Sequence, residues 1–390
     1  MDAKKILTNK SFCVLPWTGF ELEPNGTVKN CIISTTKIGD TSTQDIQQIL
    51  LSKQNLETKK AMLEDKKPKN CSGCYLQEKN RKNLSSISSR LYYNKELAKL
   101  VDNDLFDKIE NFSLHHVDLR WTNHCNQACV YCSPEYSSKW AQELGTKVES
   151  SYENRKKVKN FVFENVRKLK NIYLAGGEPL LMNENKEFLE LLLKENASVN
   201  IRVNTNLSST HTGVFDLLCN FKNIHWTVSV DAIEKEYEYI RYHGNWNYFI
   251  KNLRDIQKLK HKITFNMLYF ILNYNSIFST VNFFKSQGFH ENSFVIGPLY
   301  QPKYLNVLNL PDRILESTKA KLRTEINKSD YYLKNSYENI YNYILTTSWE
   351  KDINKFFKEI SSLDLRRNQS ATKVFPELFS NIGSVSSNDI

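Results

Sequence analysis

The sequence of 390 residues contains no apolar run close to the roughly 18 to 20 residues that a membrane-spanning helix needs. Its opening residues, MDAKKILTNKSF, also lack the apolar stretch and the small-residue cleavage site of a secretory signal. We therefore expect a soluble, cytoplasmic protein with no membrane partner. In that reducing compartment the 8 cysteines are expected to be metal ligands or free thiols rather than disulfides.

A compact basic stripe interleaved with aromatic residues, which would indicate a nucleic-acid-binding surface, is missing as well. The 53 Lys and Arg residues outnumber the 43 Asp and Glu residues and give a formal net charge of +10. The lysines are nevertheless spread along the chain and alternate with acids, as in LEDKKPKN. A solvated, lysine-rich surface explains this pattern, so a nucleic-acid partner or an anionic substrate is only the minor alternative.

The first hundred residues have a different texture from the rest of the chain. The segment TGFELEPNGTVKNCII predicts a hairpin, because Asn25-Gly26 provides the positive φ of a tight turn. Residues 41–67 then follow a helical period and open with Thr and Ser residues as cap candidates. NCSGCYLQEKNRKN indicates a small knuckle that leads into another polar helix.

From about residue 113, strand patterns alternate with helical patterns such as residues 153–169 and 186–197. This alternation predicts an α/β fold with a parallel sheet, built of right-handed βα units. Six units form three-quarters of an eightfold barrel, so we expect a partial (β/α)6 TIM-like barrel. The six candidate strands are residues 114–121, 171–176, 199–204, 224–231, 262–270 and 292–297.

The chain is too long for one minimal core, and its 40% hydrophobic residues are enough for a large one. We expect three regions. Residues 1–104 form a small cysteine-rich module of hairpin and helices, residues 105–310 form the barrel, and residues 311–390 form a helical C-terminal region. The amphipathic segments 310–328 and 349–368 are the evidence for the last region.

Three cysteines with the spacing C-x3-C-x2-C follow the first barrel strand. Loops at this C-terminal face of a barrel carry active sites. Cys125, Cys129 and Cys132 could bind three irons of a four-iron cube and leave the last iron open for another ligand. The alternative is a structural zinc knuckle with a distant fourth ligand and His124 at hand. Knuckles usually pair C-x2-C with a second such pair, so the spacing favours the open iron–sulfur site.

A second motif, YLAGGEPLL, ends the second barrel strand. Gly176 and Gly177 have no Cβ and would allow a ligand to approach the backbone closely. Glu178 projects a carboxylate at the same face, and Pro179 stiffens the turn. A Gly-Gly pair alone is weak evidence, but its place one βα unit after the cysteines makes it specific.

Together the two motifs resemble the radical S-adenosylmethionine enzymes, whose hallmarks are C-x3-C-x2-C after strand one and Gly-Gly-Glu-Pro after strand two. Tyr131, directly before Cys132, also fits that family. The resemblance covers roughly residues 113 to 310. It implies a [4Fe–4S] cluster held by the three cysteines, with S-adenosylmethionine on the open iron. One electron from the cluster would cleave the sulfonium, and the resulting 5′-deoxyadenosyl radical would abstract a hydrogen from the substrate.

The resemblance also implies residues that hold S-adenosylmethionine. Backbone groups around Gly177 and the Glu178 carboxylate would hold its ammonium group, Ser229 and Asp231 end the fourth strand where relatives contact the ribose, and Arg241 could pair with its carboxylate. Each of the last three has an alternative as a turn former or a helix-surface residue. The full set of expected cofactor-binding residues is Tyr131, Gly176, Gly177, Glu178, Asn206, Ser229, Asp231 and Arg241.

Four further cysteines, Cys13, Cys31, Cys71 and Cys74, lie upstream of the barrel. They resemble the SPASM or twitch units that hold an auxiliary iron–sulfur cluster, which would be a [4Fe–4S] cluster here. The alternative is a closed zinc ribbon with the same four ligands. Such units usually follow the barrel, whereas this one precedes it. Four thiolates imply a fully ligated cluster with an electron-transfer or structural task.

These features predict an enzyme that abstracts hydrogen from a peptide or small-molecule substrate, with net oxidation assisted by the second cluster and with an external electron donor. No general base stands out, so no catalytic side chain is assigned. The competing hypothesis from another class is a non-catalytic, zinc-stapled nucleic-acid-binding protein. This hypothesis explains the cysteines but assigns no role to the AGGEP motif.

Overall fold

The computed structural model describes residues 3–79, 88–147 and 152–383. In this part of the chain, one nine-stranded sheet has the order β3-β2-β1-β4-β5-β6-β7-β8-β9. Strands β4 to β9 are all parallel and correspond one by one to the six predicted strands, which confirms the partial barrel. Their bounds are β4 (His116–Leu119), β5 (Asn171–Leu174), β6 (Asn200–Thr205), β7 (Ile224–Ser229), β8 (Lys262–Tyr269) and β9 (Phe294–Pro298).

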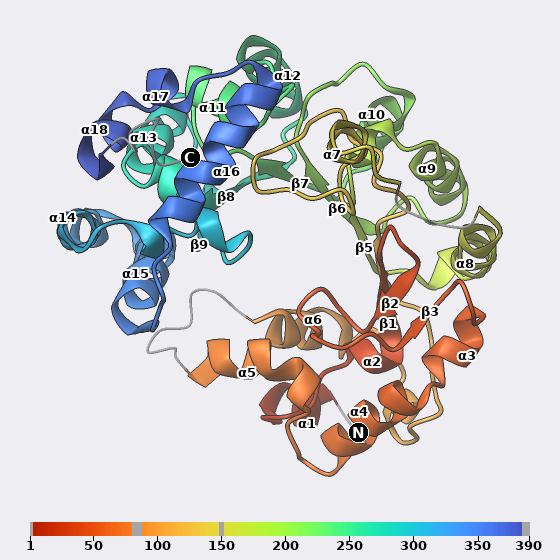
Figure 1. Ribbon diagram of the computed structural model, residues 1–390. Coiled ribbons are helices and arrows are strands. Elements are labelled where there is room, and N and C mark those ends of the chain that lie inside the picture. Colours follow the sequence, from red (N-terminus) through yellow and green to blue (C-terminus); the bar gives the residue numbers. More distant parts are fainter. Residues whose placement is uncertain (1–2, 80–87, 148–151, 384–390) are drawn as a thin grey trace.

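The sheet curves around a central space, and helices cover its outer face (Figure 1). Alternation along each strand separates the two faces: Ile201 and Val203 of β6 are buried in the main core, while Arg202 between them faces inward. The outer helices are α8 (Tyr152–Glu164), α9 (Asn183–Glu195), α10 (Gly213–Leu218), α11 (Glu234–Ile240), α12 (Trp246–Lys258) and α13 (Ile277–Ser286).

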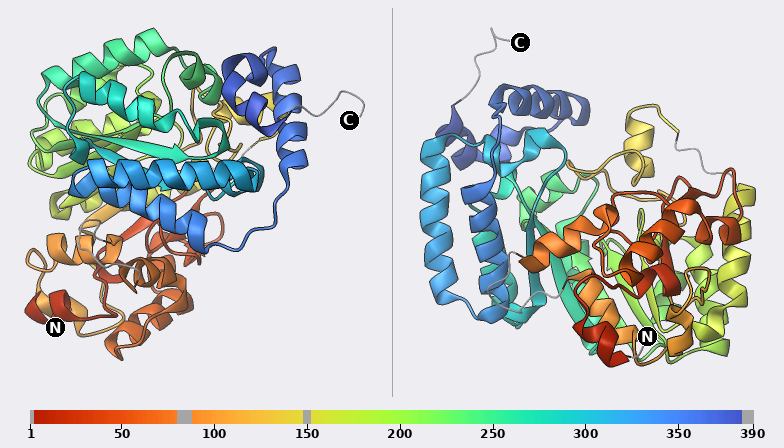
Figure 2. Two further views of the ribbon diagram at one scale, coloured as in Figure 1. Left: turned by 90° about the vertical axis from the view of Figure 1, so that its left-hand side faces the viewer. Right: turned by 90° about the horizontal axis from the view of Figure 1, so that it is seen from below.

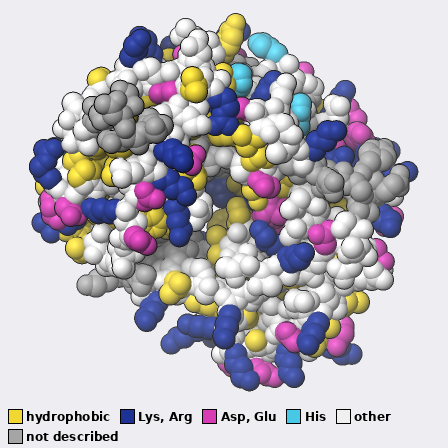
Figure 3. Space-filling view, viewed as in Figure 1, with side chains coloured by type: hydrophobic (Ala, Val, Ile, Leu, Met, Phe, Trp, Pro, Cys, Tyr) yellow, Lys and Arg dark blue, Asp and Glu magenta, His cyan; other side chains and the backbone are white. Residues whose placement is uncertain are grey.

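The inner face of the sheet is polar. One unbroken row of partners in register crosses seven strands, from β2 to β8, and we call this row the polar belt. In most barrels the interior is filled by apolar side chains. Here charged and hydroxyl groups face the space inside, and Figure 3 shows a hollow at the centre of this face of the molecule. The polar belt consists of Lys29, Glu21, Asp118, Tyr173, Arg202, His225 and Lys262.

The predicted hairpin is present and extends the barrel sheet. Strand β1 (Gly19–Leu22) pairs antiparallel with β2 (Thr27–Lys29), and Gly26 has the expected positive φ of 90°. Strand β1 also pairs in parallel with β4, and β2 pairs with β3 (Gly39–Asp40). The N-terminal segment is therefore continuous with the barrel sheet, a pairing that sequence reasoning missed. The boundary near residue 104 stays a prediction.

Residues 41–67 form two helices instead of one continuous pattern. Helix α3 (Ile46–Leu50) ends before Leu51, and α4 (Lys53–Leu63) begins after Ser52. The early Thr and Ser residues are not the caps: Asp45 caps α3 in a capping box, and Ser52 caps α4. The other helices of this region are α1 (Ala3–Thr8), α2 (Leu15–Thr18), α5 (Ser72–Lys79) and α6 (Ser89–Leu97).

The predicted helical C-terminal region is confirmed, and its described part has three helices more than the sequence patterns indicated. Helices α14 (Asp312–Lys328) and α16 (Ile353–Arg367) match the two amphipathic segments, and α15 (Tyr331–Thr346) lies between them. Figure 2 shows α14 and α15 side by side along the β9 edge, and the Ile296 amide donates to Ser336 of α15. The region ends with α17 (Ala371–Val374) and α18 (Pro376–Ile382).

Short 3-10 turns connect these elements at Lys69–Cys71, Asn103–Phe106, Val166–Lys168, Pro179–Leu181, Ile271–Asn273, Glu291–Ser293, Lys303–Leu305 and Val307–Asn309. Among the helices of the described residues, none combines the length and the apolar character needed to cross a membrane.

Candidate functional site

The three barrel cysteines lie in the loop between β4 and α7 (Ser138–Glu143), at the carboxyl end of the parallel strands. All three are free thiols; Cys125 and Cys129 are buried, and Cys132 is partly buried. The hydroxyl of Ser138 accepts from the Cys125 amide at 3.1 Å and donates to the Cys125 carbonyl at 3.0 Å. The Trp140 indole donates to the Cys129 carbonyl at 2.7 Å. These bonds fix the backbone that carries the thiols.

Two backbone hydrogen bonds connect the same loop to the segment around the end of α11. The amide of Ala128 donates to the Tyr242 carbonyl at 2.9 Å, and the amide of Val130 donates to the Ile240 carbonyl at 2.8 Å. Arg241, between the two acceptors, therefore lies directly beneath the cysteine loop.

Arg241, Asp231 and Tyr131 form one buried network below Cys129. Arg241 Nη2 donates to Asp231 Oδ2 at 2.8 Å, and the Tyr131 hydroxyl donates to the same oxygen at 2.7 Å. Arg241 Nη1 lies 3.9 Å from the Cys129 sulfur, and Arg241 Nε has no partner among the described residues. Asp231 is fully buried, and its Oδ1 accepts from the Leu268 amide. Three of the expected cofactor-binding residues thus bind one another.

Glu178 and Asn206 hold the loop on the Cys125 side. The Glu178 carboxylate is buried and accepts from the Thr205 hydroxyl at 2.6 Å, the Asn206 amide at 2.7 Å and the Leu180 amide at 3.1 Å. The Asn206 side chain lies 3.7 Å from the Cys125 sulfur. Burial raises the pKa of Glu178 to about 7, against the opposing effect of its hydrogen bonds.

The glycine pair is needed for a close approach of two protein segments. A Cβ on Gly177 would lie 2.2 Å from the His124 carbonyl oxygen, and Gly176 has φ of +107° and lies against Thr122. Both neighbours belong to the segment that leads into the cysteine loop. The absence of Cβ at this turn therefore allows the Gly-Gly-Glu-Pro turn and the cysteine loop to lie in contact. The role of Gly176 and Gly177 in holding the cofactor stays a prediction.

Burial raises the pKa of all three thiols. The pKa of Cys132 rises to about 12, from burial first and the neighbouring Cys129 second. The guanidinium of Arg241 opposes this effect at Cys129. The thiols of the metal-free chain are therefore protonated near neutral pH, and binding a metal group must release their protons.

The C-terminal helix α16 reaches the cysteine loop through Arg367, which sequence reasoning did not single out. Its guanidinium lies 4.6 Å from the Trp140 ring centroid and 4.5 Å from that of Tyr242, and it donates to Glu143 at 3.0 to 3.2 Å. Trp140 in turn holds the Cys129 carbonyl. The C-terminal region therefore supports the outer wall of the loop. No sequence signal joins Arg367 to residue 140, because the contact spans more than two hundred residues.

The four N-terminal cysteines come together in a second, smaller core. Cys13 and Cys74 are buried, Cys31 and Cys71 are partly buried, and all four are free thiols. Burial raises the pKa of Cys31 to about 12, with further contributions from the nearby Cys71 and Cys74. The four thiols are thus near enough for their charges to interact.

Ser229, the last of the expected residues, and the nearby Asn204 face the barrel interior. Ser229 is partly buried at the end of β7, and Asn204, one strand away on β6, has a buried side-chain oxygen with no partner in the described part of the chain. Neither contacts the cysteine loop through a described hydrogen bond. The predicted contact of Ser229 with a cofactor stays a prediction.

An acidic cluster that sequence reasoning missed lies inside the barrel below the cysteines. Asp118 of β4 and Glu21 of β1 are partners in register, and Arg120 binds Asp118 at 3.0 and 3.1 Å. Arg120 Nε also lies 3.1 Å from Glu21, but neither Glu21 oxygen accepts a well-aligned hydrogen bond from a described residue. Burial and then the Asp118 charge raise the pKa of Glu21 to about 8.

Replacing Glu21 by glutamine is expected to stabilise the protein at pH 9 and to change little at pH 5. Between about 4.5 and 8, folded Glu21 keeps a proton that the unfolded chain has lost, so the free energy of unfolding falls as the pH rises. Glutamine mimics the protonated form at every pH and removes that loss, on the order of 3 kcal/mol at pH 9. Urea unfolding of Glu21→Gln at both pH values measures this effect.

Glu23→Gln is the matched control. Burial opposes ionisation of Glu23, but its 2.7 Å bond from Lys29 prevails and lowers its pKa, so this variant should lose stability at pH 9. An equal loss of stability at pH 5 and pH 9 for Glu21→Gln would contradict the expected ionisation.

Two family models match the chain. The Radical SAM superfamily model matches residues 119–284, which include Cys125, Cys129, Cys132 and the Gly-Gly-Glu-Pro turn. The SPASM model, an iron–sulfur cluster-binding domain, matches residues 13–75, which include all four N-terminal cysteines. The first domain implies a [4Fe–4S] cluster with S-adenosylmethionine, and the second implies an auxiliary iron–sulfur cluster. The second match also favours iron and sulfur over the zinc-ribbon alternative.

The cysteine loop fits such a cluster by the chemistry of its donors. It presents three free thiols on one backbone segment that hydrogen bonds hold from both sides. Within residues 3–79, 88–147 and 152–383, no three His, Cys, Asp or Glu side chains lie close enough to hold a metal ion. A zinc ion needs its sulfur ligands about 2.3 Å away, whereas a cluster takes each cysteine at a different iron. Three thiols match three irons and leave the fourth iron to an external ligand.

Solved structures with a similar course of the chain share little sequence with it. The structure described as native anSMEcpe with bound AdoMet and Cp18Cys peptide is 14% identical, with a TM-score of 0.42, over 57% of this chain and 61% of that one. Streptococcus suis SuiB bound to precursor peptide SuiA is 14% identical, with a TM-score of 0.40, over 73% and 64%. The chain thus spans less than two thirds of the length of these structures.

No curated protein sequence matches the chain. The two family models together include every cysteine of both predicted ligand sets, and the parallel strand order agrees with a barrel of this type. Residues 119–284 are therefore similar to the Radical SAM superfamily, and residues 13–75, which precede them, are similar to the SPASM iron–sulfur cluster-binding domain.

Proposed function

We propose that this protein is an S-adenosylmethionine-cleaving enzyme that abstracts a hydrogen atom from a peptide or small-molecule substrate and completes a net oxidation. The observation that carries this proposal is the contact between two motifs at the carboxyl end of the sheet. Three free thiols lie on one loop, and the Gly176-Gly177 turn lies against that loop with no room for a Cβ. Such an end of a barrel is where substrates and cofactors meet.

Cys125, Cys129 and Cys132 would hold the cluster, and the turn around Gly177 and Glu178 would hold S-adenosylmethionine. When bound, these groups supply one electron to the sulfonium and a 5′-deoxyadenosyl radical that takes a hydrogen atom from the substrate. The guanidinium of Arg241 places a positive charge 3.9 Å from the Cys129 sulfur, and this charge favours the thiolate that ligation requires. Asp231 and Tyr131 keep the guanidinium in that position.

The barrel interior would receive the substrate. Its inner face offers hydrogen-bonding groups in place of a packed apolar core, including the unpartnered Asn204 oxygen. Helix α16 closes one side of the cysteine loop through Arg367 and limits the access of water there. A substrate within the interior would lie below the cysteine loop and beside the acidic cluster of Glu21 and Asp118.

The auxiliary site would serve as the electron acceptor for net oxidation. The N-terminal core that contains Cys13, Cys31 and Cys71 also includes Tyr93 of α6, and the Tyr93 ring lies 4.3 Å from that of His116 on β4. This ring contact therefore links the N-terminal core to the inner face of the barrel. An external reductant must still supply the electron that starts each turnover.

The test is the metal content of anaerobically prepared protein together with cleavage of S-adenosylmethionine. We expect about eight irons per chain, matching sulfide, and formation of 5′-deoxyadenosine when dithionite is added. About four irons and one zinc would keep the enzyme and remove the electron-acceptor role of the N-terminal site. Zinc at both sites, with no cleavage and with salt-dependent binding of nucleic acid, would overturn the proposal in favour of the zinc-stapled alternative.

A further inference from the structure

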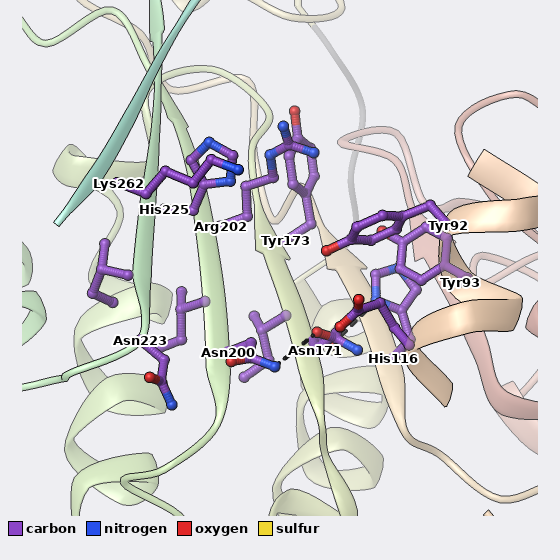
Figure 4. A pocket seen from close by; sticks show the side chains of 14 residues that line it. Tyr92, Tyr93, His116, Asn171, Tyr173, Asn200, Arg202, Asn223, His225 and Lys262 are labelled. Carbon is purple, nitrogen blue, oxygen red and sulfur yellow. Dashed lines mark hydrogen bonds between the residues drawn. The ribbon is translucent and has the colours of Figure 1, made fainter. Parts of the chain in front are cut away.

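A cavity of about 300 Å³ lies at the amino ends of the barrel strands, away from the cysteine loop. Its walls are the first residues of β5 to β8 on one side and helix α6 on the other, as Figure 4 shows. The N-terminal faces of barrels usually serve stability. This one is instead open and lined by polar groups, among them Asn171, Asn200 and Asn223.

Two cations of the polar belt face this cavity without an acidic partner. Arg202 donates through Nε to the Thr227 hydroxyl at 3.0 Å, and it forms no ion pair with a described residue. Lys262, two strands along in the same row, also has no ion pair in the described ranges. His225 lies between them and is neutral, because burial and the two cations lower its pKa to about 3. Glu96 is the only carboxylate among the residues that line the cavity.

Aromatic rings complete the wall opposite the cations. Tyr92 and Tyr93 of α6 form an edge-to-face pair with ring centroids 5.0 Å apart, and Tyr173 of β5 is the belt neighbour of Arg202. Figure 4 places Lys262, His225, Arg202 and Tyr173 at one level, with the two α6 tyrosines beside them. A partly buried guanidinium with free N–H groups beside rings is suited to a flat or tetrahedral anion.

A solvated lysine and arginine at a barrel end would be the simpler explanation. Against it, the two side chains lie in one register row, flank a neutral histidine, and face a cavity that α6 encloses from the other side. Lys29 of the same row does have a carboxylate partner, Glu23 at 2.7 Å, which lies outside the row, whereas Arg202 and Lys262 form no ion pair with a described residue.

We propose that Arg202 and Lys262 form an anion subsite at the floor of the barrel interior, which binds a carboxylate or phosphate group of the substrate. This inference rests on the proposed function and adds the class of substrate. Arg202 and Asn206, whose side chain lies beside Cys125, are four positions apart, and at about 3.3 Å per residue they lie about 13 Å apart along the chain. The subsite would therefore hold the anionic group at the opposite end of β6 from the cysteine loop.

The test uses small probes and the cluster-loaded protein. Saturation-transfer NMR titrations would compare phenylacetate and phenyl phosphate with phenylacetamide, their uncharged counterpart. We expect at least one anion to bind about tenfold more tightly than phenylacetamide, and Arg202→Gln or Lys262→Gln to remove most of that preference. Lys258→Gln is the control, since this exposed lysine of α12 pairs with Asp255 outside the cavity.

The two anions separate the possible substrates, because preference for phenylacetate indicates a carboxylate and preference for phenyl phosphate indicates a phosphorylated compound. Equal binding of all three probes, or an unchanged preference in both folded variants, would overturn the subsite. Cleavage of S-adenosylmethionine is measured separately on the same samples. Intact cleavage without anion preference refutes only the subsite, whereas anion preference without cleavage refutes only the proposed enzyme.

Discussion

Replacing Cys125 by alanine is expected to abolish cleavage of S-adenosylmethionine, by a factor of at least about 1,000, and to remove about four irons per chain. In this variant the four-iron cluster keeps only two of its three cysteine ligands, and a second iron is left without a protein ligand. The Asn206 side chain, 3.7 Å from the Cys125 sulfur, offers only a weak amide in its place. Iron and sulfide analysis with quantified 5′-deoxyadenosine measures both effects.

Cys219→Ala is the matched control for this experiment. Cys219 is also a free, partly exposed thiol, but it ends α10 and belongs to neither ligand set. We expect full iron content and full cleavage in this variant. Unchanged iron and cleavage in Cys125→Ala would exclude Cys125 as a ligand of the cluster that cleaves S-adenosylmethionine.

The six barrel strands could be predicted from the sequence because each is a short, apolar-rich run with turn residues at its ends. Burial of one face against helices imposes this pattern locally, so no knowledge of the partner strand is needed. Helix α15 escaped prediction because its many tyrosines and asparagines weaken the apolar period, although Leu333, Tyr337 and Ile340 do form a buried stripe. The break between α3 and α4 depends on one residue, Ser52. Its side chain caps the start of α4, which competes with continuation of α3 as one helix.

The pairing of β1 with β4 could not be predicted from the sequence. Gly19 lies opposite His116, almost a hundred residues later, and only the close approach of the two backbones explains the glycine. The polar belt also depends on strand pairing. Alternation along β6 and along β7 indicates which side chains of each strand share a face, but only the register between the strands places Arg202 beside His225. Long-range register is a property of packed strands and leaves no local pattern.

The two cysteine sets could be singled out from the sequence because their spacing is typical of metal ligands, and their role as cluster ligands stays a prediction. The residues around them were harder to assign, since the same side chain can bind a cofactor or the protein. Gly177 was singled out for ligand approach, and the structure shows in addition that it admits the His124 carbonyl. Arg241 and Asp231 were assigned separately to a cofactor, yet they form an ion pair with each other. Whether Arg241 and Asp231 bind the cofactor or only each other requires measurement.

Replacing Arg241 by methionine is expected to lower the free energy of unfolding of the cluster-free protein by about 3 to 5 kcal/mol. Asp231 is fully buried, and without the guanidinium its charge would keep only the Tyr131 hydroxyl and the Leu268 amide. Neutralising both partners in Arg241→Met with Asp231→Asn should recover much of that loss, since no buried charge is then left alone. Urea unfolding of the two variants and of Asp231→Asn completes the cycle.

Arg241→Lys separates the structural role from a contact with S-adenosylmethionine. Arg241 Nη2 already donates to Asp231 and Nη1 faces the Cys129 sulfur, whereas Nε has no partner among the described residues. A bidentate pair with the cofactor carboxylate would have to share Nη2 with the Asp231 contact. We therefore expect Arg241→Lys to lower stability and to weaken S-adenosylmethionine binding by less than about tenfold. A hundredfold weaker Kd with unchanged unfolding would instead assign the guanidinium to the cofactor, and the network beneath Cys129 would then have to rearrange on binding.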